Sequence, residues 1–253
     1  MADLRWAGGR LDPSDVIVNC AAYTRVDDAQ TDEAVAAVVN ADGPAHLAAV
    51  TAASGARLVH LSTDYVFDGP AAPRPADRTA PYEPDDTGGE PPSVYGRTKL
   101  AGERRVRAAD PMATIVRTAW VYTGGPDDND FVATMRRLAA QREKLTVVDD
   151  QTGSPTYAID LARGLWELIA ADAGRGTVLH ATNAGWTTWC GLAQAVFTAD
   201  GLDADRVAPC TTADFPRPAP RPAYSVLSPL SWADAGLSPL RDWRDALIDA
   251  LVR

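Results

Sequence analysis

Two side chains suited to acid–base chemistry, Tyr95 and Lys99, stand four residues apart in the segment Tyr-Gly-Arg-Thr-Lys. On a helix, residues at this spacing share one face and can act on the same substrate atom. A lysine ammonium beside a phenol favours the phenolate and moves the phenol pKa from about 10 toward neutrality. The pair therefore predicts a tyrosine that acts as a general acid at physiological pH. The alternative is two exposed helix residues, because this spacing often arises by chance.

Small and polar residues follow three predicted strands at the points where those strands end. Apolar runs at 16–22, 57–62 and 114–120 have the composition of buried parallel strands. They end in Ala21-Ala22-Tyr23, in Ser62-Thr63-Asp64 and in Ala119-Trp120-Val121-Tyr122. Because ligands of such sheets bind at the carboxyl ends of the strands, these ends predict one site near Tyr95.

Helical patterns alternate with the strands. They predict helices over 31–53 (interrupted at 42–44), 93–109, 129–141, 156–171, 188–200 and 242–252, with further strands over 145–148 and 177–181. The alternation predicts an α/β fold with a Rossmann-like, doubly wound parallel sheet. We expect residues 1–123, with late elements from 145–180, to form a partial dinucleotide-binding domain. Residues 124–253 are expected to form a small C-terminal substrate-binding lobe.

Composition argues against several other classes of protein. A formal net charge of -10 disfavours broad contact with nucleic-acid phosphates. No apolar run approaches the ~20 residues of a membrane span, and Met1 to Gly9 has no signal-peptide pattern. The cysteines and histidines lack metal-ligand spacing, and sparse cysteine suits the reducing cytoplasm. These residues are Cys20, Cys190, Cys210, His46, His60 and His180.

A set of motifs, in order along the chain, carries a resemblance to a known family. The motifs are Asn19–Asp27, Asn40–Ala45, Leu61–Gly69, Val94–Glu103, Arg117–Tyr122, Val148–Tyr157, Arg221–Ser225 and Leu240–Arg244. With them the chain resembles the dTDP-4-dehydrorhamnose reductases, extended members of the short-chain dehydrogenase/reductase superfamily. The resemblance implies hydride transfer from NADPH or NADH to the C4 keto group of dTDP-4-dehydro-L-rhamnose, which gives dTDP-L-rhamnose.

The resemblance also implies roles for individual residues. Tyr95 would protonate the developing alkoxide, and Lys99 would hold the nicotinamide ribose and lower the tyrosine pKa. Thr63 would hydrogen-bond the keto oxygen or the tyrosine. The cofactor contacts implied besides Tyr95 and Lys99 are Ala21, Ala22, Tyr23 and Ser62. The expected substrate contacts are Thr63, Asp64, Trp120, Arg217 and Arg221, the two arginines because their guanidinium forks fit a diphosphate.

Each substrate contact has a simpler alternative. Trp120 can be a core residue, Asp64 can cap a turn, and the arginines can lie in a solvated proline-rich loop. The function has alternatives too. One is a non-catalytic regulatory subunit of the same fold, like the beta subunit of methionine adenosyltransferase, and another is a reductase for a different dTDP-deoxysugar. Some family members form Mg²⁺-linked dimers, so Mg²⁺ and a homodimer belong among the expectations.

One element of the family pattern has no counterpart in the sequence. The family opens with a strand, a glycine-rich turn and a helix that hold the cofactor pyrophosphate, whereas this sequence has no GxGxxG or GxxGxxG. We expect either an internal start or a chain that truly lacks the segment and hence the element that chooses between NADH and NADPH. In both cases we expect the chain as written to have little reductase activity.

Overall fold

The computed structural model describes residues 11–67, 80–86, 89–125 and 127–252. Its main sheet has four parallel strands in the order β1-β2-β3-β8. The strands are β1 (Val16–Asn19), β2 (Arg57–Thr63), β3 (Thr114–Thr118) and β8 (Val178–His180). The β-branched and aliphatic residues of β2 and β3 are almost all buried, which explains why these short runs form central strands. The predicted parallel α/β fold is thus confirmed.

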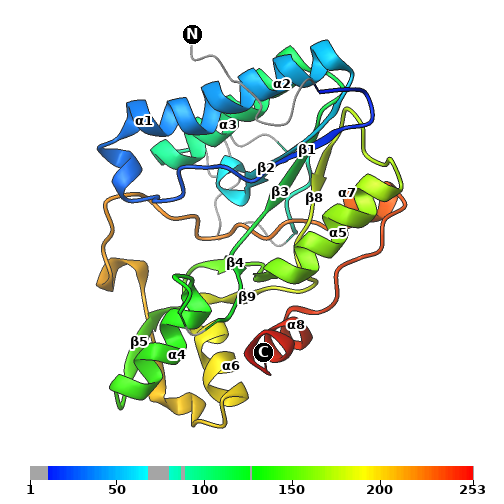
Figure 1. Cartoon of the computed structure of the whole chain (residues 1–253). Helices are drawn as coiled ribbons and strands as arrows, with labels where there is room; N and C mark the ends of the chain where they lie inside the picture. Colours follow the sequence, from blue (N-terminus) through cyan, green and yellow to red (C-terminus); the bar gives the residue numbers. More distant parts are fainter. Residues whose placement is uncertain (1–10, 68–79, 87–88, 126, 253) are drawn as a thin grey trace.

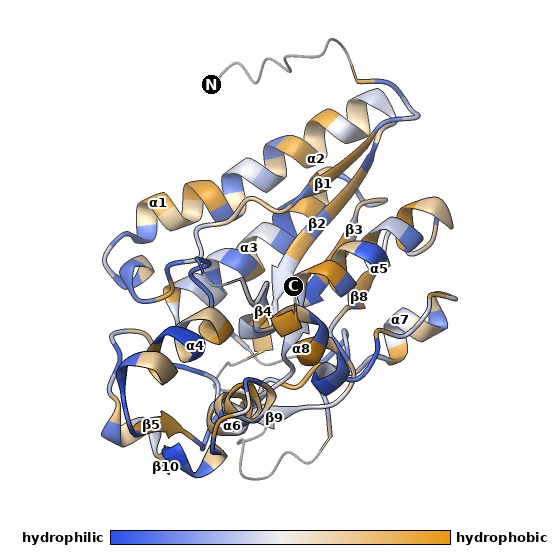
Figure 2. Ribbon diagram, turned by 60° about the horizontal axis from the view of Figure 1, so that its bottom comes forward, coloured by the Kyte–Doolittle hydropathy of each residue, from blue (hydrophilic) through white to orange (hydrophobic). Residues whose placement is uncertain are grey.

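Helices cover both faces of this sheet (Figure 1). One face carries α1 (Glu33–Ala37), α2 (Gly43–Ser54) and α3 (Val94–Ala109), and the other carries α5 (Ala158–Ala170) and α7 (Leu230–Asp234). Figure 2 shows apolar residues gathered in the strands between these layers. Because side chains alternate along each strand, one face of β2 packs on α3 and the other on α5. The sheet is therefore doubly wound around a buried core.

A second group of elements lies below the carboxyl ends of the sheet strands in Figure 1. The parallel pair β5 (Leu145–Val148) and β10 (Val207–Cys210) packs with α4 (Phe131–Gln141), α6 (Trp189–Ala199) and α8 (Trp243–Val252). Short pairs join it to the main sheet region: β4 (Val121–Tyr122) with β7 (Thr156–Tyr157), and β6 (Thr152–Gly153) with β9 (Thr187–Thr188). Apart from these elements, the described chain has short 3₁₀ turns at Asp28–Gln30, Asp64–Phe67, Ala204–Arg206 and Thr212–Asp214.

Three details differ from the sequence-based expectations. The interruption expected near residues 42–44 is a π-helical segment, Val38–Asp42, so the chain stays helical from α1 through α2. Residues 145–148 pair with β10 and not with the main sheet. Strand β1 lies at the edge of the described sheet, and its Val16 and Val18 are 38% and 37% exposed, so it is not the fully buried strand that its apolar run suggested.

Two residues of α3, its N-cap Ser93 and the interior Gly102, show how local chemistry positions the site. Ser93 begins α3 by accepting a hydrogen bond from the Gly96 N–H, and Gly102 lets α3 approach the π-helical segment. A Cβ atom at Gly102 would lie 2.1 Å from the Asn40 carbonyl oxygen, so only glycine fits there. Among the described residues, no helix is long and apolar enough to cross a membrane.

Candidate active site

Tyr95 and Thr63 meet in a cavity of about 560 Å³ at the carboxyl end of the sheet. Tyr95 comes from the first turn of α3, and Thr63 is the last residue of β2. The Thr63 hydroxyl lies close enough to the Tyr95 phenol to affect its pKa. The lining also includes Cys20, Ala22, Asp64, Lys99, Ala119 and Trp120. Three strand ends and the α3 pair therefore share one cavity, as their order along the chain predicted.

Burial sets the protonation state of Tyr95. Desolvation raises its pKa to about 12, the neighbouring Thr63 hydroxyl opposes the shift, and the nearby Asp64 carboxylate adds to it. The expectation that Lys99 lowers this pKa toward neutrality is therefore wrong for the protein without ligands. The phenol keeps its proton at physiological pH, which is the form that a proton donor requires.

Lys99 is buried directly behind Tyr95, one helical turn further along α3. Its ammonium donates a hydrogen bond to the Leu61 carbonyl oxygen at 2.7 Å, which fixes the side chain against β2. Desolvation lowers the pKa of Lys99 to about 8, although the Glu103 carboxylate favours the charged form. At neutral pH the cavity therefore holds a buried cation next to a protonated phenol.

Asp64 is 2% exposed, so it is no surface cap. It accepts a hydrogen bond from the Thr63 hydroxyl at 2.9 Å, and that hydroxyl also accepts one from the Tyr65 N–H. Burial raises the pKa of Asp64 to about 6, while the hydrogen bonds from Ser225 and Thr63 oppose the rise. The residue thus orients Thr63 as well as lining the cavity.

Trp120 forms one wall of the cavity in an unusual backbone conformation. Its φ of 47° lies in the left-handed region, which a bulky residue enters at a cost of about 1–3 kcal/mol. The indole stacks on Trp189, with ring centroids 3.5 Å apart and planes 7° from parallel. A Cβ atom at Gly153 would lie 2.4 Å from the same indole. Glycine at 153 is therefore needed for Trp120 to take this position.

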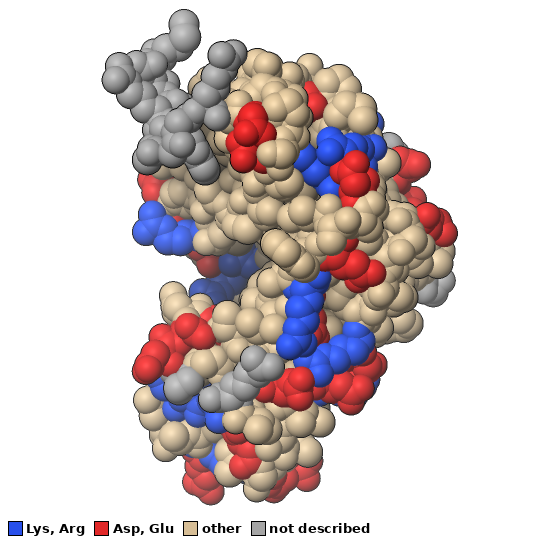
Figure 3. All heavy atoms as spheres, turned by 45° about the vertical axis from the view of Figure 1, so that its right-hand side comes forward, with Lys and Arg blue, Asp and Glu red and all other residues tan. Residues whose placement is uncertain are grey.

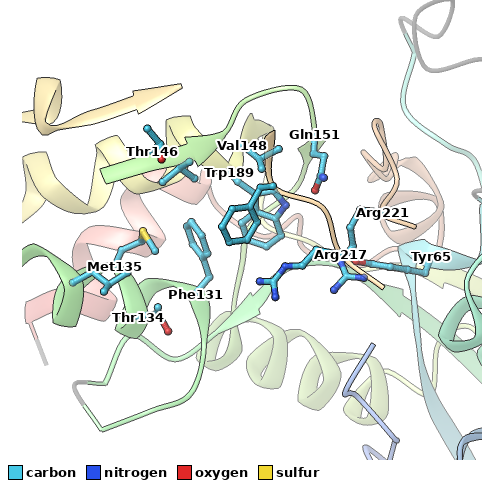
Figure 4. A pocket seen from close by; sticks show the side chains of 13 residues that line it. Tyr65, Phe131, Thr134, Met135, Thr146, Val148, Gln151, Trp189, Arg217 and Arg221 are labelled. Carbon is cyan, nitrogen blue, oxygen red and sulfur yellow. The ribbon is translucent and has the colours of Figure 1, made fainter. Parts of the chain in front are cut away.

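A second cavity of about 410 Å³ opens on the other side of Trp189. Its lining is apolar at one end, with Phe131, Met135 and Trp189, and basic at the other, with Arg217 and Arg221. Figure 4 shows the two arginines between the aromatic side chains and Tyr65. Tyr65 and Trp189 line both cavities, so the two spaces adjoin. Figure 3 shows the corresponding hollow between the two groups of elements, with basic side chains inside it.

Not every expected cofactor contact reaches the cavity. Ala22 lines it, whereas Ala21 and Tyr23 are not among its lining residues, and the Tyr23 hydroxyl donates to Asp32 at 2.8 Å. Ser62 lines the cavity, yet its hydroxyl donates to Glu103 on α3. Its side chain alternates to the opposite face of the sheet from Thr63, as neighbours on a strand must.

The structure also brings in residues that no motif chemistry singled out. Asn40 is fully buried in the π-helical segment, accepts from the Tyr23 N–H and donates to the Thr98 hydroxyl, so it ties α3 to the loop after β1. Glu103 and Arg117 form a buried ion pair at 2.7 Å. The sequence did contain signals for both contacts: Asn40 is a polar residue within an alanine-rich helix, and Glu103 is a carboxylate four residues after Lys99.

The doubly wound sheet, with a Tyr-Lys pair and a hydroxyl donor at its strand ends, places this protein among the short-chain dehydrogenase/reductase enzymes. The described residues hold no cluster of three or more His, Cys, Asp or Glu side chains that could bind a metal, so nothing here supports the expected Mg²⁺. The chemistry available is proton donation by a phenol in a cavity of about 560 Å³.

Comparisons with known proteins define the group more closely. The family profile described as RmlD substrate binding domain matches residues 10–253. A dTDP-4-dehydrorhamnose reductase of Mycobacterium tuberculosis is 59% identical over 94% of this chain and 76% of its own length. The chain therefore belongs to the dTDP-4-dehydrorhamnose reductase family.

Two further relatives bear on the ligands. A crystal structure of the dTDP-4-dehydrorhamnose reductase of Bacillus anthracis in complex with NADP has a TM-score of 0.84 and 35% identity over 94% of this chain and 80% of that one. A Streptomyces antibioticus protein named probable dTDP-4,6-dihydroxy-2-methyloxan-3-one 4-ketoreductase is 50% identical over 93% of this chain and 75% of its own length. The family thus includes proteins named for different dTDP-sugar ketones.

Proposed function

We propose that this protein reduces the C4 keto group of dTDP-4-dehydro-L-rhamnose to give dTDP-L-rhamnose, with NADPH or NADH as the hydride source. The observation that carries the proposal is the protonated Tyr95 phenol, which lines one cavity with Thr63, and this cavity adjoins an aromatic and basic one. Membership of the family, and the names of its relatives, favour an enzyme over the regulatory-subunit alternative.

The catalytic cavity suits the nicotinamide end of the cofactor. Small side chains, Ala22 and Cys20, leave room beside the buried Lys99 ammonium, which would hold the ribose hydroxyls. When bound, the cofactor supplies the hydride for the carbonyl carbon. Lys99 contributes a positive charge next to the reacting atoms, and Trp120 helps to keep water away from them.

Proton transfer falls to Tyr95. A carbonyl oxygen within reach of both hydroxyls would accept a hydrogen bond from Tyr95. It would accept a second one from Thr63 once the Thr63 hydroxyl turns its proton from Asp64 to the substrate, and both stabilise the negative charge that develops on it. Tyr95 then gives its proton to the alkoxide. The Tyr65 N–H holds the Thr63 oxygen in place, so only the hydroxyl proton has to turn from Asp64 toward the substrate. The nearby Lys99 ammonium stabilises the resulting phenolate.

The second cavity suits the dTDP part of the substrate. Phe131, whose ring packs 4.6 Å from that of Trp189, offers an aromatic side chain for the thymine base. Arg217 and Arg221 offer guanidinium forks for the diphosphate. Because Trp189 separates the two spaces and stacks on Trp120, a nucleotide sugar bound here would extend from the arginines toward Tyr95.

Three expectations remain proposals of smaller scope. A homodimer and a cytoplasmic location are predictions from sequence. The third is the division into domains, in which residues 1–123 bind mainly the cofactor and residues 124–253 bind mainly the substrate. The arrangement of the two cavities supports the last, since the aromatic side of the second cavity comes from α4 and α6.

The test is product identification. Purified protein is incubated with dTDP-4-dehydro-L-rhamnose and a high concentration of NADPH or NADH, because the sequence has no glycine-rich turn to hold the pyrophosphate. We expect slow formation of dTDP-L-rhamnose by NMR, with equimolar loss of the reduced nicotinamide. Turnover of a different dTDP-4-keto sugar alone would favour the other deoxysugar reductase, and binding of dTDP without turnover of any would contradict the proposal.

A further inference from the structure

Asp27 joins two parts of the chain that are far apart in sequence. It follows β1, and its neighbour Val26 lines the catalytic cavity. Its carboxylate accepts a hydrogen bond from the Arg221 guanidinium at 2.9 Å and lies 3.7 Å from that of Arg217. Both arginines line the second cavity. One carboxylate on the cofactor side therefore contacts both basic groups on the substrate side.

The same carboxylate also holds the backbone between the two arginines. Its second oxygen accepts a hydrogen bond from the Ala219 N–H at 3.2 Å, and Ala219 is 1% exposed. Ala219 lies midway between Arg217 and Arg221, in a segment with proline at 216, 218, 220 and 222. Prolines fix φ and stiffen the chain, so a contact at Ala219 also places the two arginines that flank it.

Arg221 is held in a defined orientation. One terminal nitrogen donates to Asp27 and the other donates to the Ala219 carbonyl oxygen at 3.0 Å. Among the described residues its Nε has no hydrogen-bond partner, and its side chain is only 18% exposed. A guanidinium held at its two outer nitrogens can still offer its remaining N–H groups to a second anion.

We propose that Asp27 is a positioning residue that fixes the Arg217–Arg221 segment for the substrate diphosphate. The inference rests on the function proposed above. Burial would raise the pKa of Asp27, but the Ala219 N–H and the two arginines lower it overall, so the carboxylate is charged whenever the segment is in place. The site keeps a net positive charge, because two guanidinium groups face one carboxylate.

An opposite role for Asp27 makes a different prediction. If the carboxylate only competed with the diphosphate for the arginines, its removal would tighten nucleotide binding. If it positions them, its removal weakens binding, because the freed segment loses conformational order that the ligand must then restore. The two roles are thus separated by the sign of one affinity change.

The experiment is a calorimetric titration of the full chain with dTDP. We expect Asp27→Asn to weaken dTDP binding about tenfold, as for loss of a hydrogen bond to a charged group. Asp28→Asn is the matched control, since Asp28 is next in sequence, exposed and paired only loosely with Arg25 at 3.4 Å. It should bind dTDP like the wild type.

A double-mutant cycle with Arg221→Gln shows whether Asp27 acts through the arginine. We expect Asp27→Asn to weaken binding less once Arg221 is replaced, and the remaining effect to come from the contacts of Asp27 with Arg217 and Ala219. If Asp27→Asn proves poorly folded by its thermal melt, Asp27→Glu keeps the charge, shifts the anchor by one methylene and should also weaken binding. Unchanged or tighter binding by a folded variant overturns the inference, whereas a wild type that does not bind dTDP overturns the proposed function as well.

Discussion

Trp120 and Trp189 stack face to face, with ring centroids 3.5 Å apart, across the boundary between the two cavities. Trp120 follows a sheet strand, and Trp189 begins α6 of the second group of elements. Trp189 lines both cavities, and Trp120 holds a left-handed backbone to reach it. The stack therefore joins a wall of the cavity that holds Tyr95 to a wall of the cavity that holds the two arginines.

The space at Gly153 makes this stack testable. Gly153→Ala places a methyl group about where the Trp120 indole now lies, so the ring must move. We expect KM for the dTDP-sugar to rise about tenfold or more, with a smaller change in kcat, because a displaced wall mainly loses substrate binding. Steady-state kinetics of the purified variant measure both constants.

A second glycine provides the control for that substitution. At Gly43 a Cβ atom would meet only the Val38 carbonyl oxygen at an ordinary 3.5 Å, and its φ of -56° suits alanine. Gly43→Ala should leave both kinetic constants within about twofold of wild type, as expected of a change remote from the site. If the Gly153 and Gly43 variants have equal kinetic constants, the position of Trp120 does not affect binding of the dTDP-sugar.

Lys99 predicts the alkaline limb of the pH profile. Burial lowers its pKa to about 8, so the ammonium is present below this pH and is lost above it. Because Tyr95 keeps its proton until about pH 12, we expect kcat/KM to fall above about pH 8 through Lys99 alone. Lys99→Arg, which stays charged, should move that limb to higher pH, and an unmoved limb would assign it to another group.

Asp64 predicts a pH dependence of stability. Its folded pKa of about 6 exceeds the ordinary 3.8, so the folded state binds the proton more tightly. The resulting stability is complete below about pH 4 and is lost as pH rises through about 6. Between pH 4 and pH 7 the wild type should therefore lose on the order of 3 kcal/mol relative to Asp64→Asn. Urea unfolding of both proteins at the two pH values measures this difference, and parallel curves would refute it.

The buried ion pair between Glu103 and Arg117 predicts that the protein becomes less stable when Glu103 is replaced. Both side chains are less than 10% exposed, and Glu103 also accepts the Ser62 hydroxyl. Glu103→Gln leaves Arg117 with an uncompensated buried charge, so unfolding should become easier by about 3–5 kcal/mol. Asp42→Asn breaks a half-exposed pair with Arg105 and should cost about 1 kcal/mol or less. Equal decreases in the free energy of unfolding for the two variants would mean that the buried pair stabilises the protein no more than the half-exposed one.

Local patterns predicted most of the fold. Apolar runs and helical spacing located β2, β3, β8 and the longer helices to within a few residues, because burial and backbone geometry leave the same period in the sequence. The strand that pairs with residues 145–148 was not predictable, because a half-buried strand has the same sequence pattern whether it joins the main sheet or pairs with β10. The exposure of β1 depends on its place at the described edge, which no local pattern encodes.

The site was predicted where chain order decides geometry. Strand ends of a parallel sheet must meet, so Thr63, Tyr95 and Trp120 lie together as expected. Which face a strand-end side chain takes was decided by alternation, and this separated Ser62 from Thr63. The Tyr95 pKa and the Asp27 contacts depend on desolvation and on segments distant in sequence, so they required the structure.

The central claim is that Tyr95 protonates the keto oxygen of a dTDP-sugar while its carbonyl carbon receives a hydride. The direct measurement uses nicotinamide cofactor carrying transferable deuterium, with mass spectrometry of the dTDP-sugar product for wild type and Tyr95→Phe. We predict deuterium at C4 with the wild type and a rate lower by about 10² to 10⁴ in the variant, which should still bind dTDP. Equal rates, or product without deuterium at C4, would contradict the account.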